Sequence, residues 1–265
     1  MFEITLNDAK TVKGIFEAIS AVVGESKMSF TPDGITMNAI DDGRICLVGL
    51  ELSKDDFDAY KCEDSYDLGL NIEDMVKILK RSSSSDSITF KYKPKSKKIQ
   101  ISMKDLSSKK SRHFSLQLID LGDSGIKPEA LENIEYQATA TIPISYLEEA
   151  IKDADIFSET LQFKMSGSGG IEFKSEGQIG ATETQLAKDD DSIQNFSVED
   201  EAEGTFALQY LKNIIKINAI ADLVNLSLNS NTPVKAKFNV LSSSNFTYYL
   251  APRIEEEEED YDENY

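Results

Sequence analysis

The chain has 265 residues, of which 47 are acidic and 28 are lysine or arginine, so its formal net charge is -19. This length allows one large domain or two of ordinary size, each able to bury a core. No apolar run approaches the roughly 18 residues that a membrane helix needs, and the start of the chain lacks the pattern of a signal peptide. We therefore expect a soluble intracellular protein.

Cysteine and histidine are scarce. Two cysteines, Cys46 and Cys62, and a single histidine, His113, are too few for a disulfide framework or a zinc site. We expect both cysteines to fill strand surfaces, and we expect no metal or other cofactor. The carboxylate runs at 41–42 and 189–191 have no catalytic histidine or glycine-rich phosphate loop with them, so the sequence predicts a protein that is not an enzyme.

Four segments have the periodicity of amphipathic helices. They span residues 7–23, 71–81, 143–157 and 208–220. Asn7 or Asp8 suits the N-cap of the first helix, and Pro143 suits the start of the third. Each helix has an apolar stripe on one face and at least one lysine on the opposite face.

Most of the remaining sequence consists of short β-type runs such as 44–52, 87–92 and 113–118, separated by clusters of Gly, Pro, Asp and Ser. The lysine-rich stretch "KYKPKSKK" at 91–98 lies between two of these runs. We interpret it as a solvated turn between paired strands and not as a DNA-binding element.

The order of these elements repeats. A shift of 136 residues places Gly34-Ile35 over Gly170-Ile171 and the second helix over the fourth. The sequence therefore predicts two tandem copies of one α+β fold, at 1–118 and 135–254, with a connecting loop at 119–134. Residues 255–265 contain eight acidic side chains, and we expect this tail to be disordered.

The outer faces of the four helices carry a set of basic residues. The set is Lys10, Lys13, Lys77, Lys80, Arg81, Lys152, Lys212 and Lys216. If the helices pack on one side of a sheet layer, these residues form a continuous basic surface, although acids such as Glu17 and Glu148 weaken its field. Contacts of lysine with phosphate give affinity for DNA without sequence specificity.

Segments 34–57, 60–80 and 248–258 resemble the sliding clamps of the proliferating cell nuclear antigen family, in their archaeal and eukaryotic form. The resemblance implies a DNA polymerase processivity factor for replication and repair, which forms a trimeric ring around duplex DNA with its sheets outside and two helices per domain inside. By resemblance, Lys13, Lys77, Lys80, Lys152 and Lys216 match basic residues that face the DNA. The compartment implied is the cytoplasm or nucleoid of an archaeon, or the nucleus of a eukaryote.

The family also binds short peptides of its partners, which implies a replicative polymerase, a clamp loader, a ligase and a flap nuclease as ligands here. The peptide pocket lies between the connecting loop and the C-terminal strand. Residues that match it are Ile40, Arg44, Ile45, Leu47, Ile126, Pro233, Tyr249, Leu250, Ala251 and Pro252.

The resemblance further implies that an edge strand of the first domain pairs with one of the neighbour's second domain. Candidate strands are 109–117 and 172–183, with opposite charges that suit head-to-tail closure. The residues expected at this interface are Lys109, Lys110, Arg112, Phe114, Glu172, Glu176 and Glu183.

Two other functions remain open at this point. An acidic chaperone or scaffold for basic proteins would bind histone-like proteins through residues 255–265, and a checkpoint-type clamp subunit would share the fold. Whether the ring contains three identical chains or paralogous subunits is also left open.

Overall fold

The computed structural model describes residues 1–122, 131 and 133–253. The first half of the chain runs strand, helix, five strands, helix, three strands. Its elements are β1 (Phe2–Leu6), α1 (Ala9–Ser20), β2 (Glu25–Thr31), β3 (Gly34–Ile40), β4 (Cys46–Ser53), the 3₁₀ helix η1 (Lys54–Asp56), β5 (Ala59–Cys62), β6 (Tyr66–Asn71), α2 (Ile72–Leu79), β7 (Asp86–Tyr92), β8 (Lys98–Asp105) and β9 (Ser111–Gln117).

The second half repeats this order. Its elements are β10 (Ala138–Pro143), α4 (Ile144–Ala154), β11 (Thr160–Ser166), β12 (Gly170–Gly177), β13 (Gly180–Leu186), β14 (Gln194–Val198), β15 (Ala202–Ala207), α5 (Leu208–Ile214), the 3₁₀ helix η2 (Ile215–Ala219), β16 (Leu223–Leu228), β17 (Val234–Asn239) and β18 (Asn245–Leu250). The predicted α+β architecture with two tandem copies of one fold is confirmed.

The repeat shows most clearly at two glycines. Gly34 and Gly170 begin β3 and β12 with φ angles of +156° and +93°. A Cβ atom would lie 2.1 Å from the carbonyl oxygen of Leu52 at the first position and 2.2 Å from that of Leu186 at the second. Both positions therefore require glycine for the same steric reason.

Local signals set the helix starts. Asp8, the second of the two predicted N-caps, accepts the backbone N–H of Thr11 at 3.0 Å, and Asn71 accepts that of Asp74 at 2.8 Å. The fourth predicted helix, 208–220, is α-helical only over α5 and continues as the 3₁₀ helix η2.

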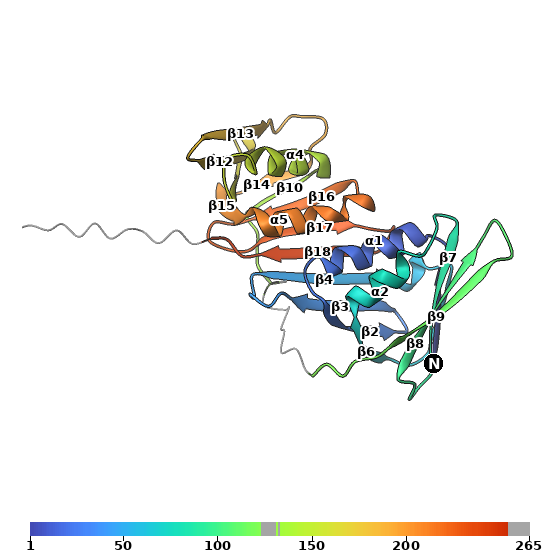
Figure 1. The fold of residues 1–265 in the computed structure, drawn as a ribbon. Coiled ribbons are helices and arrows are strands. Elements are labelled where there is room, and N and C mark those ends of the chain that lie inside the picture. Colours follow the sequence, from blue (N-terminus) through green and yellow to red (C-terminus); the bar gives the residue numbers. More distant parts are fainter. Residues whose placement is uncertain (123–130, 132, 254–265) are drawn as a thin grey trace, which may run out of the picture.

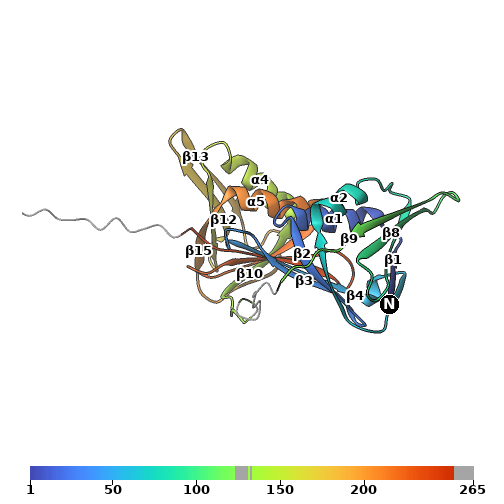
Figure 2. The ribbon, with the colours of Figure 1, turned by 60° about the horizontal axis from the view of Figure 1, so that its bottom comes forward.

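Three antiparallel sheets support the helices. Their strand orders are β5-β1-β7-β8-β9, β14-β10-β16-β17-β18-β4-β3-β2-β6 and β13-β12-β11-β15. The nine-stranded sheet crosses both halves, because β18 pairs with β4 from Asn245↔Glu51 to Leu250↔Cys46. Figure 1 shows the five-stranded sheet at one end of the molecule and the four-stranded sheet at the other. In Figure 2, α4, α5, α1 and α2 form a row along one side, with the nine-stranded sheet beneath them.

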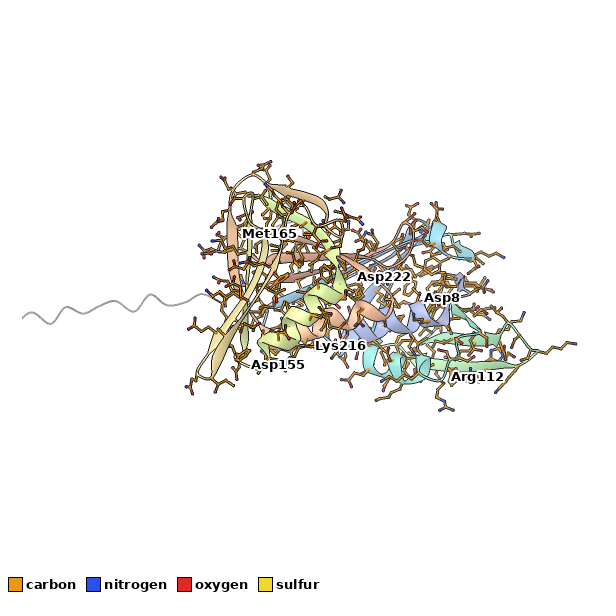
Figure 3. The ribbon with its side chains drawn as sticks, turned by 90° about the horizontal axis from the view of Figure 1, so that it is seen from above. Asp8, Arg112, Asp155, Met165, Lys216 and Asp222 are labelled. Carbon is orange, nitrogen blue, oxygen red and sulfur yellow. The ribbon has the colours of Figure 1, made fainter. Side chains whose placement is uncertain are left out.

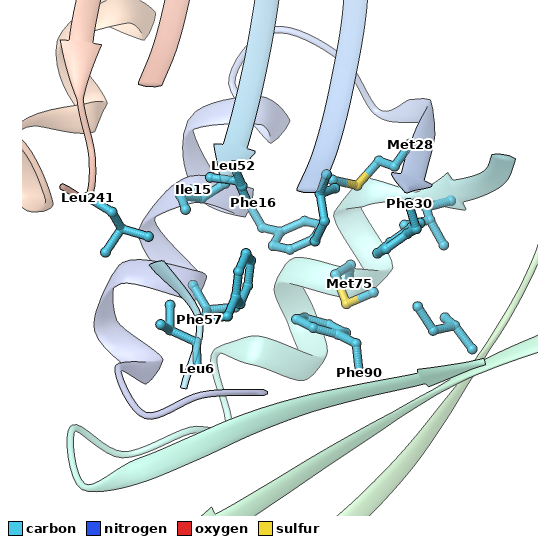
Figure 4. A pocket seen from close by; sticks show the side chains of 14 residues that line it. Leu6, Ile15, Phe16, Met28, Phe30, Leu52, Phe57, Met75, Phe90 and Leu241 are labelled. Carbon is cyan, nitrogen blue, oxygen red and sulfur yellow. The ribbon is translucent and has the colours of Figure 1, made fainter. Parts of the chain in front are cut away.

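An apolar core fills the space between the helices and the sheets. In the first half it encloses a cavity of about 30 Å³, lined by apolar side chains that include Phe16, Met75 and Phe90 (Figure 4). A water molecule fits such a volume but requires polar partners, which these side chains do not offer. The cavity is therefore a packing gap in the core.

The cysteines are buried and unbonded. Cys46 begins β4 and Cys62 ends β5, and both face the core. Burial, with a smaller contribution from the nearby Asp41 carboxylate, raises the pKa of the Cys46 thiol to about 12. Both cysteines thus act as small apolar side chains within strands, as predicted. In the part of the chain that the structure describes, no helix is long and apolar enough to cross a membrane.

Candidate nucleic-acid interface and protein-binding surfaces

The structure brings the predicted basic set to one side of the molecule. All eight residues belong to the four helices, to η2 or to the two residues that follow α2. Lys13 is half-buried and the other seven are exposed. Figure 3 shows Asp155 and Lys216 along this row of helices, with Lys216 near the middle of the molecule and Arg112 at one end.

Carboxylates occupy the same face. The α-helices α1, α2, α4 and α5 together contain five lysines and six acids, so the continuous basic surface that we predicted needs correction. Acidic and basic side chains alternate there instead, because the helix positions that face solvent in this acidic chain accept both.

Four of the eight basic residues form ion pairs with neighbouring acids. Lys77 pairs with Asp74 at 2.8 Å, Lys80 with Glu17 at 3.9 Å and Lys152 with Glu148 at 2.7 Å. A hydrogen bond from Lys152, with a smaller contribution from Asn218, lowers the pKa of Glu148. The hydrogen bond to Asp74 raises the pKa of Lys77. The fourth pair joins Lys212 to Asp155 across α5 and the end of α4.

The remaining four, Lys10, Lys13, Arg81 and Lys216, have no carboxylate within ion-pair distance in the described residues; Lys216 donates to the Asn213 amide oxygen at 2.9 Å. An exposed ion pair contributes at most about 1 kcal/mol, so a phosphate can displace the carboxylate from a paired lysine, whereas an unpaired lysine has no carboxylate to lose. These four side chains are therefore the readiest contacts for an anion on the helix face.

Most of the residues predicted for the peptide pocket lie where β18 meets β4. Tyr249 lies opposite Leu47, and Leu47 lies opposite Ile40 on β3. The Ala251 N–H donates to the carbonyl oxygen of Ile45 at 2.9 Å. Pro233 precedes β17, beside the same end of β18, and Pro252 follows Ala251. The structure thus brings these predicted residues together from three distant segments.

Leu250 is a correction within this set. It is fully buried and lies opposite Cys46, whereas its neighbour Tyr249 lies on the other face of the sheet. Because side chains alternate along a strand, Leu250 belongs to the core and cannot share a surface with Tyr249. Ile126, which we also assigned to the pocket, lies outside the described residues.

A loop of five residues shapes the rim of this surface. The Asp41 carboxylate accepts the backbone N–H groups of Gly43 at 3.1 Å, Ile45 at 2.7 Å and Cys46 at 2.7 Å. Arg44 adopts a φ of +56° at the loop tip, and Ile45 keeps 38% of its surface exposed. The loop therefore presents one basic and one apolar side chain on a fixed backbone.

A contact that no sequence pattern indicates holds this loop to the second half of the chain. The Tyr210 hydroxyl on α5 donates to Asp41 at 3.2 Å, although the two residues are far apart in the chain. Burial and the Asp41 charge raise the pKa of Tyr210. The pocket rim and a helix of the second domain are thus linked through one carboxylate.

The predicted contact strand 109–117 contains the edge strand β9, whereas the predicted strand 172–183 divides into the inner strand β12 and the edge strand β13. β9 is an edge of the five-stranded sheet and β13 an edge of the four-stranded sheet. Phe114 on β9 is partly buried against the core, and Glu183 on β13 accepts from the Gln185 amide at 2.5 Å. Glu172 and Glu176 lie on β12, one strand inside the edge.

Arg112, which we assigned to the subunit interface, forms contacts within its own chain. Its Nη2 donates to the Asp86 carboxylate at 2.5 Å, and its Nη1 donates to the carbonyl oxygen of Arg81, just beyond α2. Asp86 is 2% exposed. Arg112 is therefore committed to a contact within its own chain, so Lys109 and Lys110 in the preceding turn carry the free positive charge near this edge.

Within the described residues, no group of three or more His, Cys, Asp or Glu side chains is arranged to hold a metal ion. The described surface combines a mixed-charge helix face, a loop that exposes Arg44 and Ile45, and sheet edges at β9 and β13.

These features define a class of protein, the two-domain clamps built from one duplicated α+β fold. The model of the proliferating cell nuclear antigen N-terminal domain matches residues 1–125, and that of its C-terminal domain matches residues 130–253. The chain belongs to the proliferating cell nuclear antigen family.

Curated relatives agree over nearly the full length. A DNA polymerase sliding clamp of Methanococcus maripaludis strain C5 is 31% identical over 259 residues, which cover 96% of this chain and 100% of the relative. Sliding clamps of Cenarchaeum symbiosum and Pyrococcus horikoshii are 28% and 27% identical over 254 and 255 residues, covering 96% of this chain and 98% and 99% of the relatives.

Proposed function

We propose that this chain is a DNA polymerase processivity factor that acts without catalysis inside the cell. Three copies close into a ring, and the row of helices lines the hole through which duplex DNA passes. The observation that carries the proposal is the position of the two open edges. In the described residues, β9 and β13 lie at opposite ends of the molecule (Figure 1), and α1, α2, α4 and α5 share one side (Figure 2).

That arrangement suits a head-to-tail contact. A heterologous interface repeats until the rotation closes, and each copy then uses its β9 edge against the β13 edge of the next. Edge pairing also removes two exposed strand edges that would otherwise invite aggregation. Retention on DNA follows from closure of the ring, so the helix face needs only weak and exchangeable contacts with phosphate.

Partner peptides bind, in this proposal, on the outer surface formed by β4, β18 and the 41–45 loop. The chain is then a platform for the replicative polymerase, the clamp loader, a ligase and a flap nuclease. Domains at 1–118 and 135–254, the loop at 119–134 and the tail at 255–265 complete the proposed organisation.

The test is absolute mass by light scattering, followed by retention on DNA. A concentration-independent trimer that stays on nicked circular DNA but slides off linear DNA supports the proposal. A monomer would refute the homomeric ring, and equal retention on both DNA forms would refute topological closure. Tight binding of histone-like proteins that depends on residues 255–265, with no retention on circular DNA, would favour the chaperone function.

A further inference from the structure

The solvent face of the five-stranded sheet is basic. Its charged strand residues are Glu3, Lys61, Lys91, Lys98 and Lys104. The strand register places them on one face, because Glu3 lies opposite Lys61 on β5 and Lys91 on β7, and Lys91 lies opposite Gln100 on β8. The alternating burial of β8 confirms that Lys98 and Lys104 point outward. The β7–β8 turn adds three exposed lysines. We define the lysine face as Lys61, Lys91, Lys93, Lys95, Lys97, Lys98 and Lys104.

Most of this charge is uncompensated. Among the described residues, an ion pair reaches the lysine face only at Lys91, which contacts Glu3 at 2.9 Å. Glu63 and Asp64 follow β5 nearby, and the Asp64 carboxylate accepts from the Tyr66 hydroxyl. The apolar residues of these strands face the core, so folding does not require lysines on the outer face. Like charges on one face repel one another, so binding of an anionic ligand would reduce this repulsion.

The chain supplies such an anion itself. Residues 255–265 carry eight carboxylates in eleven residues, the densest charge in the sequence. Arg253, two residues before this segment, donates its N–H to Thr205 of β15 at 2.7 Å. Figure 1 shows β15 at the end of the molecule opposite to β7, β8 and β9. Arg253, the last described residue before the acidic segment, therefore lies at the opposite end of the molecule from the lysine face.

We propose that the lysine face binds the acidic segment 255–265 of a neighbouring copy of the chain. The inference rests on the proposed head-to-tail ring, which brings the first half of one copy beside the second half of the next. Eleven extended residues span at most roughly 36–40 Å, which suits a contact between adjacent subunits. Once bound, the segment strengthens the subunit contact and shields the lysines from DNA outside the hole.

The test uses the full chain and a zero-length carbodiimide cross-linker, which joins carboxylates to lysine amines. We expect cross-links from Glu255–Glu263 to Lys93, Lys95, Lys97 and Lys98, detected by mass spectrometry. Mixing isotope-labelled with unlabelled chains shows which links join two copies. The links should be lost at about 1 M salt, where the Debye length is about 3 Å.

A variant with Lys93→Gln, Lys95→Gln and Lys97→Gln keeps the Lys98 amine, and it should lose the links to Lys98 because the turn no longer carries the charge that attracts the acidic segment. The matched control replaces Lys54 and Lys188, which are exposed lysines elsewhere, and should keep them. Light scattering on the same samples separates the two proposals. A trimer without links to the lysine face overturns this inference alone, whereas a monomer overturns the ring and the inference with it.

DNA is the competing ligand for the lysine face. Titration of both variants with a fluorescent linear duplex distinguishes DNA from the acidic segment as the ligand. A variant that has lost phosphate contacts binds DNA more weakly, and its affinity depends less on salt. We expect the triple variant to bind DNA as well as the wild-type protein does, or better. Weaker DNA binding by this variant, together with absent cross-links, would assign the lysine face to DNA instead.

Discussion

Removing the Arg112 guanidinium should destabilise the first domain. The Asp86 carboxylate is 2% exposed and accepts the Ser83 N–H at 2.8 Å and Arg112 Nη2 at 2.5 Å. Arg112→Ala leaves this buried carboxylate with a single donor. Figure 3 shows Arg112 on the strands beside α2, so the substitution also frees the Arg81 carbonyl at the end of that helix.

The size of the effect follows from burial. A hydrogen bond to a charged group contributes about 1.5–3 kcal/mol, and breaking a fully buried pair costs about 3–5 kcal/mol. The Arg112 side chain is 28% exposed, so water partly replaces it. We expect Arg112→Ala to lower the free energy of unfolding by about 2–3 kcal/mol. Arg112→Lys keeps the positive charge but loses the two separate N–H donors of the guanidinium. Its effect on the free energy of unfolding should lie between those of the wild-type protein and Arg112→Ala.

Urea unfolding at a fixed protein concentration measures the change in the free energy of unfolding. The Asp86→Ala variant and the variant with both substitutions complete a double-mutant cycle. The two single effects should fail to add, because both remove the same contact. Additivity within about 0.5 kcal/mol would refute the reasoning. So would an Arg112→Ala protein that unfolds normally but dissociates more readily on dilution, since that result would return Arg112 to the subunit contact.

Three further predictions concern other parts of the molecule. Gly170→Ala should cost more than about 1 kcal/mol in urea unfolding, because φ is +93° and the new Cβ would lie 2.2 Å from the Leu186 carbonyl oxygen; a neutral result would contradict that conformation. Burial raises the pKa of Cys46 to about 12, so the native protein should resist thiol reagents at about pH 8.5, the usual pKa of a free thiol, and fast labelling of the native protein would contradict this. The unfolded chain ionises this thiol above about pH 8.5, so the free energy of unfolding should fall as the pH rises from about 8.5 towards 12. In duplex titrations, Lys216→Gln should weaken DNA binding more than Lys152→Gln, whose charge is already paired at 2.7 Å, and the reverse order would show that the ion pairs do not limit DNA contact.

Local patterns in the sequence were enough to predict the helices and the duplicated order. Apolar periodicity identified four helices because each buries one stripe against a sheet, and Asp8 follows the ordinary preference for an acidic N-cap. The helix ends were less accurate. Nothing in 208–220 distinguishes α5 from the 3₁₀ turn η2 that continues it, since both satisfy the same apolar spacing.

Contacts between distant segments could not be predicted in the same way. The run from Tyr248 to Leu250 is apolar without alternation, so its sequence does not say which residue faces the core. The pairing of β18 with β4 decides this, and it buries Leu250 while it places Tyr249 beside Leu47. Asp86 likewise lies in a serine-rich stretch typical of an exposed turn, yet β7 carries it under Arg112.

The mixed charge of the helix face bears on how a clamp of this kind could move along DNA. Where a lysine is already held by a neighbouring acid, as Lys152 is by Glu148, binding a phosphate exchanges one anion for another. The net gain is small because both states satisfy the ammonium group, and exposed pairs contribute at most about 1 kcal/mol. In the proposed ring, a face made partly of such pairs would contact DNA weakly at every position, so closure of the ring, rather than the sum of these contacts, would supply retention.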